Sequence, residues 1–296
     1  MTVAPAWFTE ALDRQVETAQ TSVDGATIHY RVWGDAGKPG LVLVHGGAAH
    51  SRWWDHVAPA LSQTHRIISL DLSGHGDSDR RDEYSMAQWA REVIGVAEAQ
   101  QVSDGLIVVG HSMGGLVAFE TARTFPEQIS RIAMVDSPIH EHVPPDELER
   151  RRRRASNLGT VYPERNEALA RFHLIPEQID ALEFVLDHIR ETSVRAVPEG
   201  WTWKFDPRIF MHESVDLDQP FPASVPVWYL RAERGIVPPE LLDSMRRHLG
   251  SSLTVTEIAH ATHHAMVDQP LALIAAIQAV ANHLPLAARL QSTIQS

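Results

Sequence analysis

The 296-residue chain contains no cysteine. This absence excludes disulfide bonds, a thiolate nucleophile and any metal site built on cysteine. The sequence also has no run of roughly 18 apolar residues, the length that a membrane-spanning helix requires. Its first ten residues lack the basic start and apolar core of a signal peptide. We therefore expect a cytoplasmic protein that does not insert into membranes.

Basic residues are scarce relative to acidic ones. The chain has 26 Lys and Arg against 38 Asp and Glu, a formal net charge of -12. A negative protein is repelled by nucleic acids and by anionic membrane surfaces, so a small-molecule partner fits the composition better. The sequence does not set the oligomeric state, and both a monomer and a homodimer are compatible with it.

Short apolar runs rich in β-branched residues alternate along the chain with helix-like segments. Before them, residues 20–33 alternate around Asp24-Gly25, a dipeptide typical of hairpin turns. The apolar runs are residues 41–44, 66–70, 106–109, 129–135, 225–230 and 253–258, and the helix-like segments are 53–61, 86–99, 113–125 and 271–283, with a further amphipathic helix at 6–16. Alternation of this kind indicates an α/β fold with a mostly parallel eight-stranded sheet and helices on both faces.

The alternation stops between residues 137 and 223, where the sequence becomes charged, helical and poor in strands. We predict a helical cap here, inserted after the sixth strand, and a core domain made of residues 1–136 and 224–296. The insertion contains Arg150 to Arg154, which we interpret as the solvated face of a helix, with attraction of an anionic substrate as the alternative. His140-Glu141-His142 lacks a third ligand at recognisable spacing, so we expect no metal site.

The motif that carries chemistry is Gly110-His111-Ser112-Met113-Gly114, which lies between an apolar strand and a helix. A sharp strand-to-helix turn needs small neighbours and leaves the serine hydroxyl projecting above the sheet edge. This context predicts that Ser112 is a nucleophile.

A serine nucleophile needs a base to accept its proton and N–H donors for the developing oxyanion. Three histidines follow the last predicted strand, and the spacing to Asp268-Gln269-Pro270 favours His263 over His264 and His260 as the base. The oxyanion donors would be the backbone amides of Gly47, after the first parallel strand, and Met113, at a helix N-terminus.

These segments, in this order, resemble the α/β-hydrolase family. The resemblance is carried by His45-Gly46-Gly47, residues 71–78, Gly110-His111-Ser112-Met113-Gly114-Gly115 and the segment around His263, and it covers residues 23–284. It implies a serine hydrolase with a variable cap. The fold hosts many chemistries, so the resemblance does not define the substrate.

One position departs from the family pattern. Members commonly place an acid after the strand that follows the cap, but this chain has Gly235 there. The resemblance to one branch of the family, whose acid lies after an earlier strand, favours Asp136 as the partner of the histidine. Glu233, on the same loop as Gly235, is the alternative.

The combined prediction is a cofactor-free hydrolase in which Ser112, His263 and Asp136 cleave a carboxylic ester or lactone of a medium-sized hydrophobic molecule with water. Trp201, Trp203 and His111 are the predicted substrate-binding residues. A C–C bond hydrolase acting on a vinylogous diketone and a non-catalytic small-molecule receptor are the alternatives. Related dehalogenases and epoxide hydrolases attack with an aspartate, and the nucleophile position here is a serine.

Overall fold

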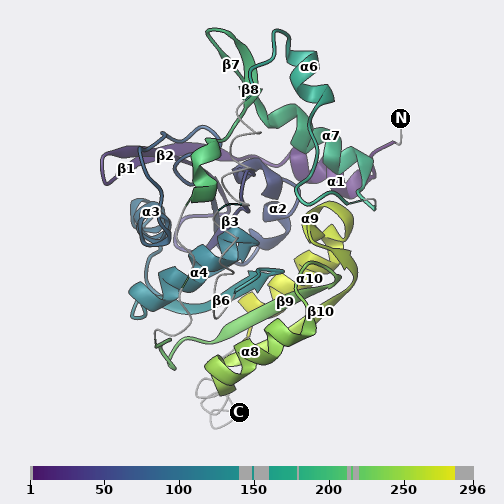
Figure 1. Cartoon of the computed structure of the whole chain (residues 1–296). Coiled ribbons are helices and arrows are strands. Elements are labelled where there is room, and N and C mark those ends of the chain that lie inside the picture. The colour runs from purple at the N-terminus through teal and green to yellow at the C-terminus, as the bar shows by residue number, and fades with distance from the viewer. Residues whose placement is uncertain are drawn as a thin grey trace.

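The computed structural model describes residues 3–139, 149, 160–178, 180–211, 215 and 220–283. In this part of the chain eight strands form one sheet in the order β1-β2-β4-β3-β5-β6-β9-β10 (Figure 1). The strands are β1 (Glu17–Val23), β2 (Ala26–Trp33), β3 (Gly40–Val44), β4 (Arg66–Leu70), β5 (Leu106–His111), β6 (Ile129–Val135), β9 (Val227–Arg234) and β10 (Leu253–Thr262). β2 pairs antiparallel with β1 and β4, and the other neighbours are parallel, which confirms the predicted sheet.

The sheet separates two hydrophobic cores because side chains of a strand point alternately to its two faces. In β3, Val42 and Val44 belong to one core, and Leu41 and Leu43 belong to the other. Helices α3 (Met86–Ala99), α4 (Met113–Thr124) and α8 (Pro239–Leu249) contribute to the first core, whereas α1 (Ala6–Leu12), α2 (Ala58–Leu61), α9 (Ala265–Asp268) and α10 (Pro270–Ala281) contribute to the second. The prediction of helices on both faces is confirmed.

The helix predicted over residues 53–61 is divided in the structure. A 3₁₀ helix, η1 (Ser51–Trp54), comes first, and α2 begins only at Ala58. Pro59 stands in the first turn of α2. Proline has no backbone N–H, so it is tolerated at a helix start but interrupts a helix that would run through it. The apolar periodicity of the segment does not reveal this break.

Between β6 and β9, the described residues form α6 (Arg165–Ala170), α7 (Glu183–Thr192), the hairpin of β7 (Val194–Val197) and β8 (Gly200–Trp203), and the 3₁₀ helix η2 (Pro207–Met211). The labelled elements α6, α7, β7 and β8 lie together in the upper part of Figure 1. The predicted insertion therefore contains a hairpin besides helices, since the Trp-rich segment pairs as a strand. The predicted domain boundaries remain a prediction, and His140, Glu141, His142 and Arg150 to Arg154 lie outside the described residues.

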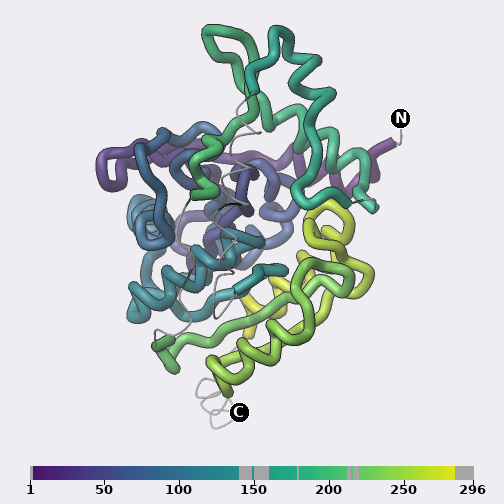
Figure 2. The backbone as a smooth tube through the Cα atoms, in the orientation of Figure 1, coloured from purple at the N-terminus to yellow at the C-terminus, as the bar shows by residue number. Residues whose placement is uncertain are grey.

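The N-terminal helix contacts the segment between β6 and β9. Figure 2 shows the chain near the N-terminus running beside α7. The ring centroids of Phe8, in α1, and Phe184, in α7, lie 4.9 Å apart in an edge-to-face arrangement. Trp7 contacts the same Phe184 ring at 6.0 Å. The apolar stripe of α1 is thus covered by protein.

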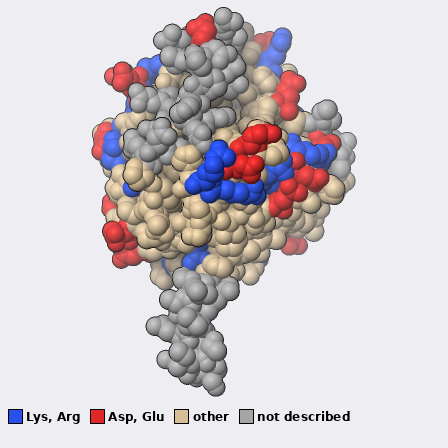
Figure 3. All heavy atoms as spheres, turned by 60° about the horizontal axis from the view of Figure 1, so that its bottom comes forward, with Lys and Arg blue, Asp and Glu red and all other residues tan. Residues whose placement is uncertain are grey.

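The surface carries charges of both signs. On the face turned forward in Figure 3, acidic and basic side chains lie next to one another. Broad tan areas of the same face carry neither kind. Within the described part of the chain, no helix combines the length and the apolar character needed to cross a bilayer. The cytoplasmic location stays a prediction.

Candidate active site

Ser112 lies at the sharp turn that joins β5 to α4. β5 ends at His111 and α4 begins at Met113, so the serine alone connects strand to helix. Its backbone has φ 53° and ψ -119°, a conformation that non-glycine residues rarely adopt. Gly114 makes the turn possible, because a Cβ atom there would lie 2.4 Å from the carbonyl oxygen of His45. The turn therefore presents the hydroxyl at the carboxyl edge of the sheet.

His263 links Ser112 to a buried carboxylate. Its Nε2 lies 3.1 Å from the Ser112 hydroxyl oxygen, and its Nδ1 lies 2.8 Å from Oδ2 of Asp136. A carboxylate only accepts hydrogen bonds, so Nδ1 carries the hydrogen and Nε2 is free to accept the serine proton. The side chains of His263 and Asp136 are 4% and 0% exposed. The three residues form one continuous chain of hydrogen bonds.

Asp136 follows β6 directly and is held by the neighbouring strand. Its backbone N–H donates to the carbonyl of Leu230 at 2.9 Å. The backbone N–H of Ile236 donates to Oδ2 of the same carboxylate, also at 2.9 Å. Burial and the nearby Asp136 charge raise the pKa of Tyr229 well above its usual value. These contacts fix the carboxylate beside the imidazole.

Glu233, the alternative acid, lies elsewhere. Its carboxylate accepts the backbone N–H of His260 at 2.6 Å, and this hydrogen bond lowers the pKa of Glu233. The side chains of Glu233 and His260 are 41% and 78% exposed. The structure therefore brings Asp136, and not Glu233, into contact with His263, and it leaves His260 at the surface.

The loop after β3 packs against Ser112. A Cβ atom placed on Gly46 would lie 3.3 Å from the Cβ of Ser112, and one on Gly47 would lie 3.7 Å from the sulfur of Met113. The two residues predicted to supply oxyanion donors, Gly47 and Met113, are thus neighbours beside Ser112. Met113 also begins α4, where backbone N–H groups lack partners within the helix and the dipole favours negative charge.

Two further histidines adjoin the hydrogen-bonded chain of Ser112, His263 and Asp136. Nε2 of His111 donates to the carbonyl of His263 at 2.9 Å, and burial lowers the pKa of His111 well below its usual value. Burial likewise lowers the pKa of His264 to about 3. Ring nitrogens of His111, His263 and His264 lie within 4.8 Å of one another, an arrangement that could hold a metal ion. Both nitrogens of His263 already serve Ser112 and Asp136, so an ion would have to displace that chain.

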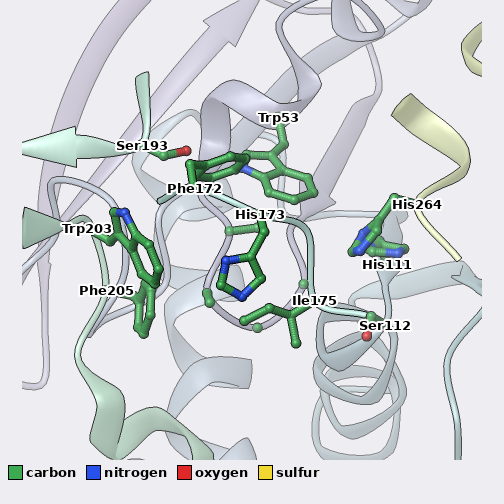
Figure 4. Close-up of a pocket in the computed structure, with 14 residues that line it drawn as sticks. Trp53, His111, Ser112, Phe172, His173, Ile175, Ser193, Trp203, Phe205 and His264 are labelled. Carbon is green, nitrogen blue, oxygen red and sulfur yellow. The ribbon is translucent and has the colours of Figure 1, made fainter. Parts of the chain in front are cut away.

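A pocket opens onto Ser112 (Figure 4). It is lined by Gly46, Gly47, Ala48, Ala49, Trp53, His111, Ser112, Phe172, His173, Ile175, Ser193, Trp203, Phe205 and His264. Two predicted substrate-binding residues, Trp203 and His111, therefore lie at the pocket. Trp201 does not line it. Trp201 stands nearer the tip of the β7–β8 hairpin, where its ring lies 5.8 Å from the Arg165 guanidinium.

Several pocket residues carried no signal in the sequence. Trp53 was part of an amphipathic pattern typical of a core helix, and Phe172, Ile175 and Ser193 stand in segments without a motif. Trp53 reaches the site from η1, after β3, whereas the other three reach it because the segment between β6 and β9 folds over the carboxyl edge of the sheet.

The sequence of this chain is similar to those of several known proteins. The curated relatives include a pimeloyl-[acyl-carrier protein] methyl ester esterase of Nitrosomonas europaea, 38% identical over 112 residues, which are 38% of this chain and 42% of that protein. They also include mouse epoxide hydrolase 4, 27% identical over 117 residues, 38% of this chain and 32% of that protein. The chain spans less than half the length of these curated relatives.

Solved structures match over much more of the chain. The thioesterase domain from the curacin biosynthetic pathway superposes with a TM-score of 0.71 at 21% identity, covering 90% of this chain and 99% of that domain. At this identity the similarity concerns the fold alone. The sequence model described as "Alpha/beta hydrolase family" matches residues 41–277. Because the match covers most of the chain and the sheet has the corresponding strands, this protein belongs to the alpha/beta hydrolase family.

Proposed function

We propose that this protein is a serine hydrolase that cleaves a carboxylic ester of a small molecule through an acyl-enzyme. The observation that carries the proposal is the buried hydrogen-bonded chain from Ser112 through His263 to Asp136, with distances of 3.1 and 2.8 Å. A serine hydroxyl is a weak nucleophile until an adjacent base accepts its proton. His263 occupies the position of that base.

The proposed reaction has two halves. The Ser112 oxygen attacks the ester carbonyl while His263 Nε2 accepts the proton, and His263 then protonates the departing alcohol. Water, activated by the same nitrogen, next attacks the acyl-enzyme and releases the acid and the serine. Asp136 keeps the hydrogen on Nδ1 and stabilises the imidazolium that forms in each half. The backbone amides of Gly47 and Met113 are the proposed donors to the oxyanion.

The relatives support hydrolysis at an acyl carbon. One curated relative is named as a methyl ester esterase and a structural neighbour as a thioesterase, and both activities transfer an acyl group to water. Another relative is named as an epoxide hydrolase. Opening an epoxide with a serine would leave a stable ether, which a histidine-activated water does not readily release. An acyl-serine is the intermediate that this site can turn over.

A fluorophosphonate probe tests the proposal, since it reacts only with an activated serine. We expect mass spectrometry to locate one adduct on Ser112 and expect Ser112→Ala to abolish labelling. Ser193→Ala is the matched control, because Ser193 also lines the pocket but its hydroxyl donates to the carbonyl of Ile189 at 2.6 Å. Labelling that persists in Ser112→Ala would overturn the proposal. Turnover of a vinylogous diketone without ester turnover would reassign the reaction to C–C bond hydrolysis.

A further inference from the structure

The pocket has two unlike sides. Figure 4 shows Trp203 and Phe205 on one side and His111 and His264 on the other, with Trp53 above. Phe172 and Ile175 add further apolar surface. Among the described residues that line the pocket, none is Asp, Glu, Lys or Arg. A ligand with a full charge would therefore lose its hydration there without gaining a described counter-ion.

The indole N–H of Trp53 has no hydrogen-bond acceptor among the described residues. Its side chain is 5% exposed, and its Nε1 is buried without a hydrogen-bond partner in the part of the chain that the structure describes. An indole N–H only donates, so the group it lacks is an acceptor. A buried donor left unpaired destabilises the protein, and a bound ligand oxygen would remove that penalty.

Trp53 lies beyond the triad as seen from Ser112. Its ring centroid is 5.5 Å from that of His264, and the His264 ring is 4.8 Å from that of His263. The Trp53 ring therefore lies several bonds away from the carbonyl that Ser112 attacks.

His264 is a second polar group close to Trp53 in the pocket. Neither of its ring nitrogens has a hydrogen-bond partner of good geometry among the described residues, although the carbonyls of Ile175 and Pro176 lie near enough to offset part of the pKa lowering by burial. At neutral pH the ring is uncharged and offers one N–H. It therefore adds no positive charge that would balance a carboxylate.

We propose that the substrate is an uncharged ester whose acyl chain carries a carbonyl or ether oxygen, bound by the Trp53 Nε1–H, while its hydrocarbon part packs against Trp203 and Phe205. The acyl chain is assigned to the pocket because it stays bound through both halves of the reaction, whereas the alcohol leaves after the first. The proposal rests on the ester hydrolysis proposed above.

Esters that differ only in the acyl chain test this assignment. We would measure kcat/KM by titration of released acid for ethyl hexanoate, ethyl 4-oxohexanoate, ethyl 5-oxohexanoate and monoethyl adipate. The wild-type protein should turn over one of the oxo esters at least tenfold faster than ethyl hexanoate. It should turn over monoethyl adipate at least tenfold more slowly than ethyl hexanoate, because the adipate chain ends in a carboxylate. Equal values for the oxo esters and the hexanoate would overturn the proposal.

Trp53→Phe removes the N–H and keeps an aromatic ring. It should erase the preference for the oxo ester, so that kcat/KM for the oxo ester and kcat/KM for ethyl hexanoate agree within about threefold in this variant. Trp54→Phe is the matched control: the Nε1 of Trp54 is also buried without a partner among the described residues, but Trp54 does not line the pocket. The control should keep the wild-type preference. An unchanged preference in Trp53→Phe, or an equal loss in Trp54→Phe, would overturn the role of Trp53.

The two proposals fail in different ways. If the wild-type protein hydrolyses none of the four esters while Ser112 still reacts with the fluorophosphonate, the ester reaction itself is wrong. If it hydrolyses ethyl hexanoate and the oxo esters alike, only the Trp53 assignment is wrong. Should Trp53→Phe fail to fold, the comparison of the four esters on the wild-type protein still decides the substrate class.

Discussion

The carboxylate of Asp136 occupies the space that a side chain at position 235 would need. A Cβ atom placed on Gly235 would lie 2.3 Å from both carboxylate oxygens of Asp136. The carboxylate of Asp136 can therefore take its position at the end of β6 only because residue 235, on the loop after β9, has no side chain. Neighbouring parallel strands end about 4.8 Å apart, so an acid from either strand can reach the same imidazole.

Replacing the acid should impair catalysis strongly. Asp136→Asn is expected to lower kcat by about 10⁴, because the amide favours the wrong tautomer of His263 and cannot stabilise its charged form. Glu233→Gln should change kcat less than twofold, since Glu233 contacts His260 at the surface. Steady-state kinetics on a p-nitrophenyl ester measures both. A large loss in Glu233→Gln with an active Asp136→Asn would exchange the two roles.

A carboxylate introduced after β9 should be able to replace the one after β6. Gly235→Asp alone is expected to reduce activity, because the new side chain collides with Asp136. Combined with Asp136→Ala, the same substitution should recover at least tenfold of the activity that Asp136→Ala loses. Kinetics of the two single variants and the double variant form the test. A double variant no better than Asp136→Ala would show that the loop cannot aim a carboxylate at His263.

The turn at Ser112 should not accept a larger residue at position 114. A Cβ atom there would lie 2.4 Å from the His45 carbonyl and 2.5 Å from that of Val44. We expect Gly114→Ala to lower the free energy of unfolding by about 1–3 kcal/mol and to displace the nucleophile. Gly105→Ala is the control, because it has open space but a positive φ of 67°, so it incurs backbone strain alone. Urea unfolding should find Gly114→Ala less stable and far less active than Gly105→Ala.

Acid should destabilise the fold through buried neutral histidines. Burial lowers the pKa of His56 to about 4. Below the unfolded value near 6.5, the unfolded chain binds a proton that the folded protein excludes, so stability is full above that pH and falls as the pH drops towards 4. In this pH window, each such histidine makes the free energy of unfolding fall by about 1.4 kcal/mol for every unit by which the pH decreases.

His56→Gln should reduce that slope. A glutamine amide can still donate to the carbonyl of Met266, as Nε2 of His56 does at 2.7 Å, but it does not titrate. Urea unfolding between pH 4.5 and 6 should show that the free energy of unfolding falls less steeply with decreasing pH, by about 1.4 kcal/mol per pH unit. The control is His260→Gln, which also removes one histidine but at the surface, and its slope should stay steeper than that of His56→Gln. A slope identical to that of the wild type in His56→Gln would contradict the assignment.

The order of elements could be predicted because each strand and helix carries its own pattern. The Asp24-Gly25 turn pairs β1 with β2 as expected, and both residues have positive φ. The apolar runs that became β3, β5 and β6 are buried on both faces, so their composition alone indicated a parallel sheet. Pro59, which divides a predicted helix, and the β7–β8 hairpin were missed because apolar periodicity does not register a single missing N–H or the pairing of two short strands.

The sequence by itself determined the local features: a serine at a turn that only glycines permit, and histidines and acids at the ends of strands. Which of these meet was decided by the tertiary structure. Asp136 and Glu233 are equivalent as acids, and only the packing of β6 against β9 and the room left by Gly235 bring Asp136 to His263. The pocket depended on tertiary structure still more, because Trp53 and Trp203 come from segments 150 residues apart that no local pattern relates.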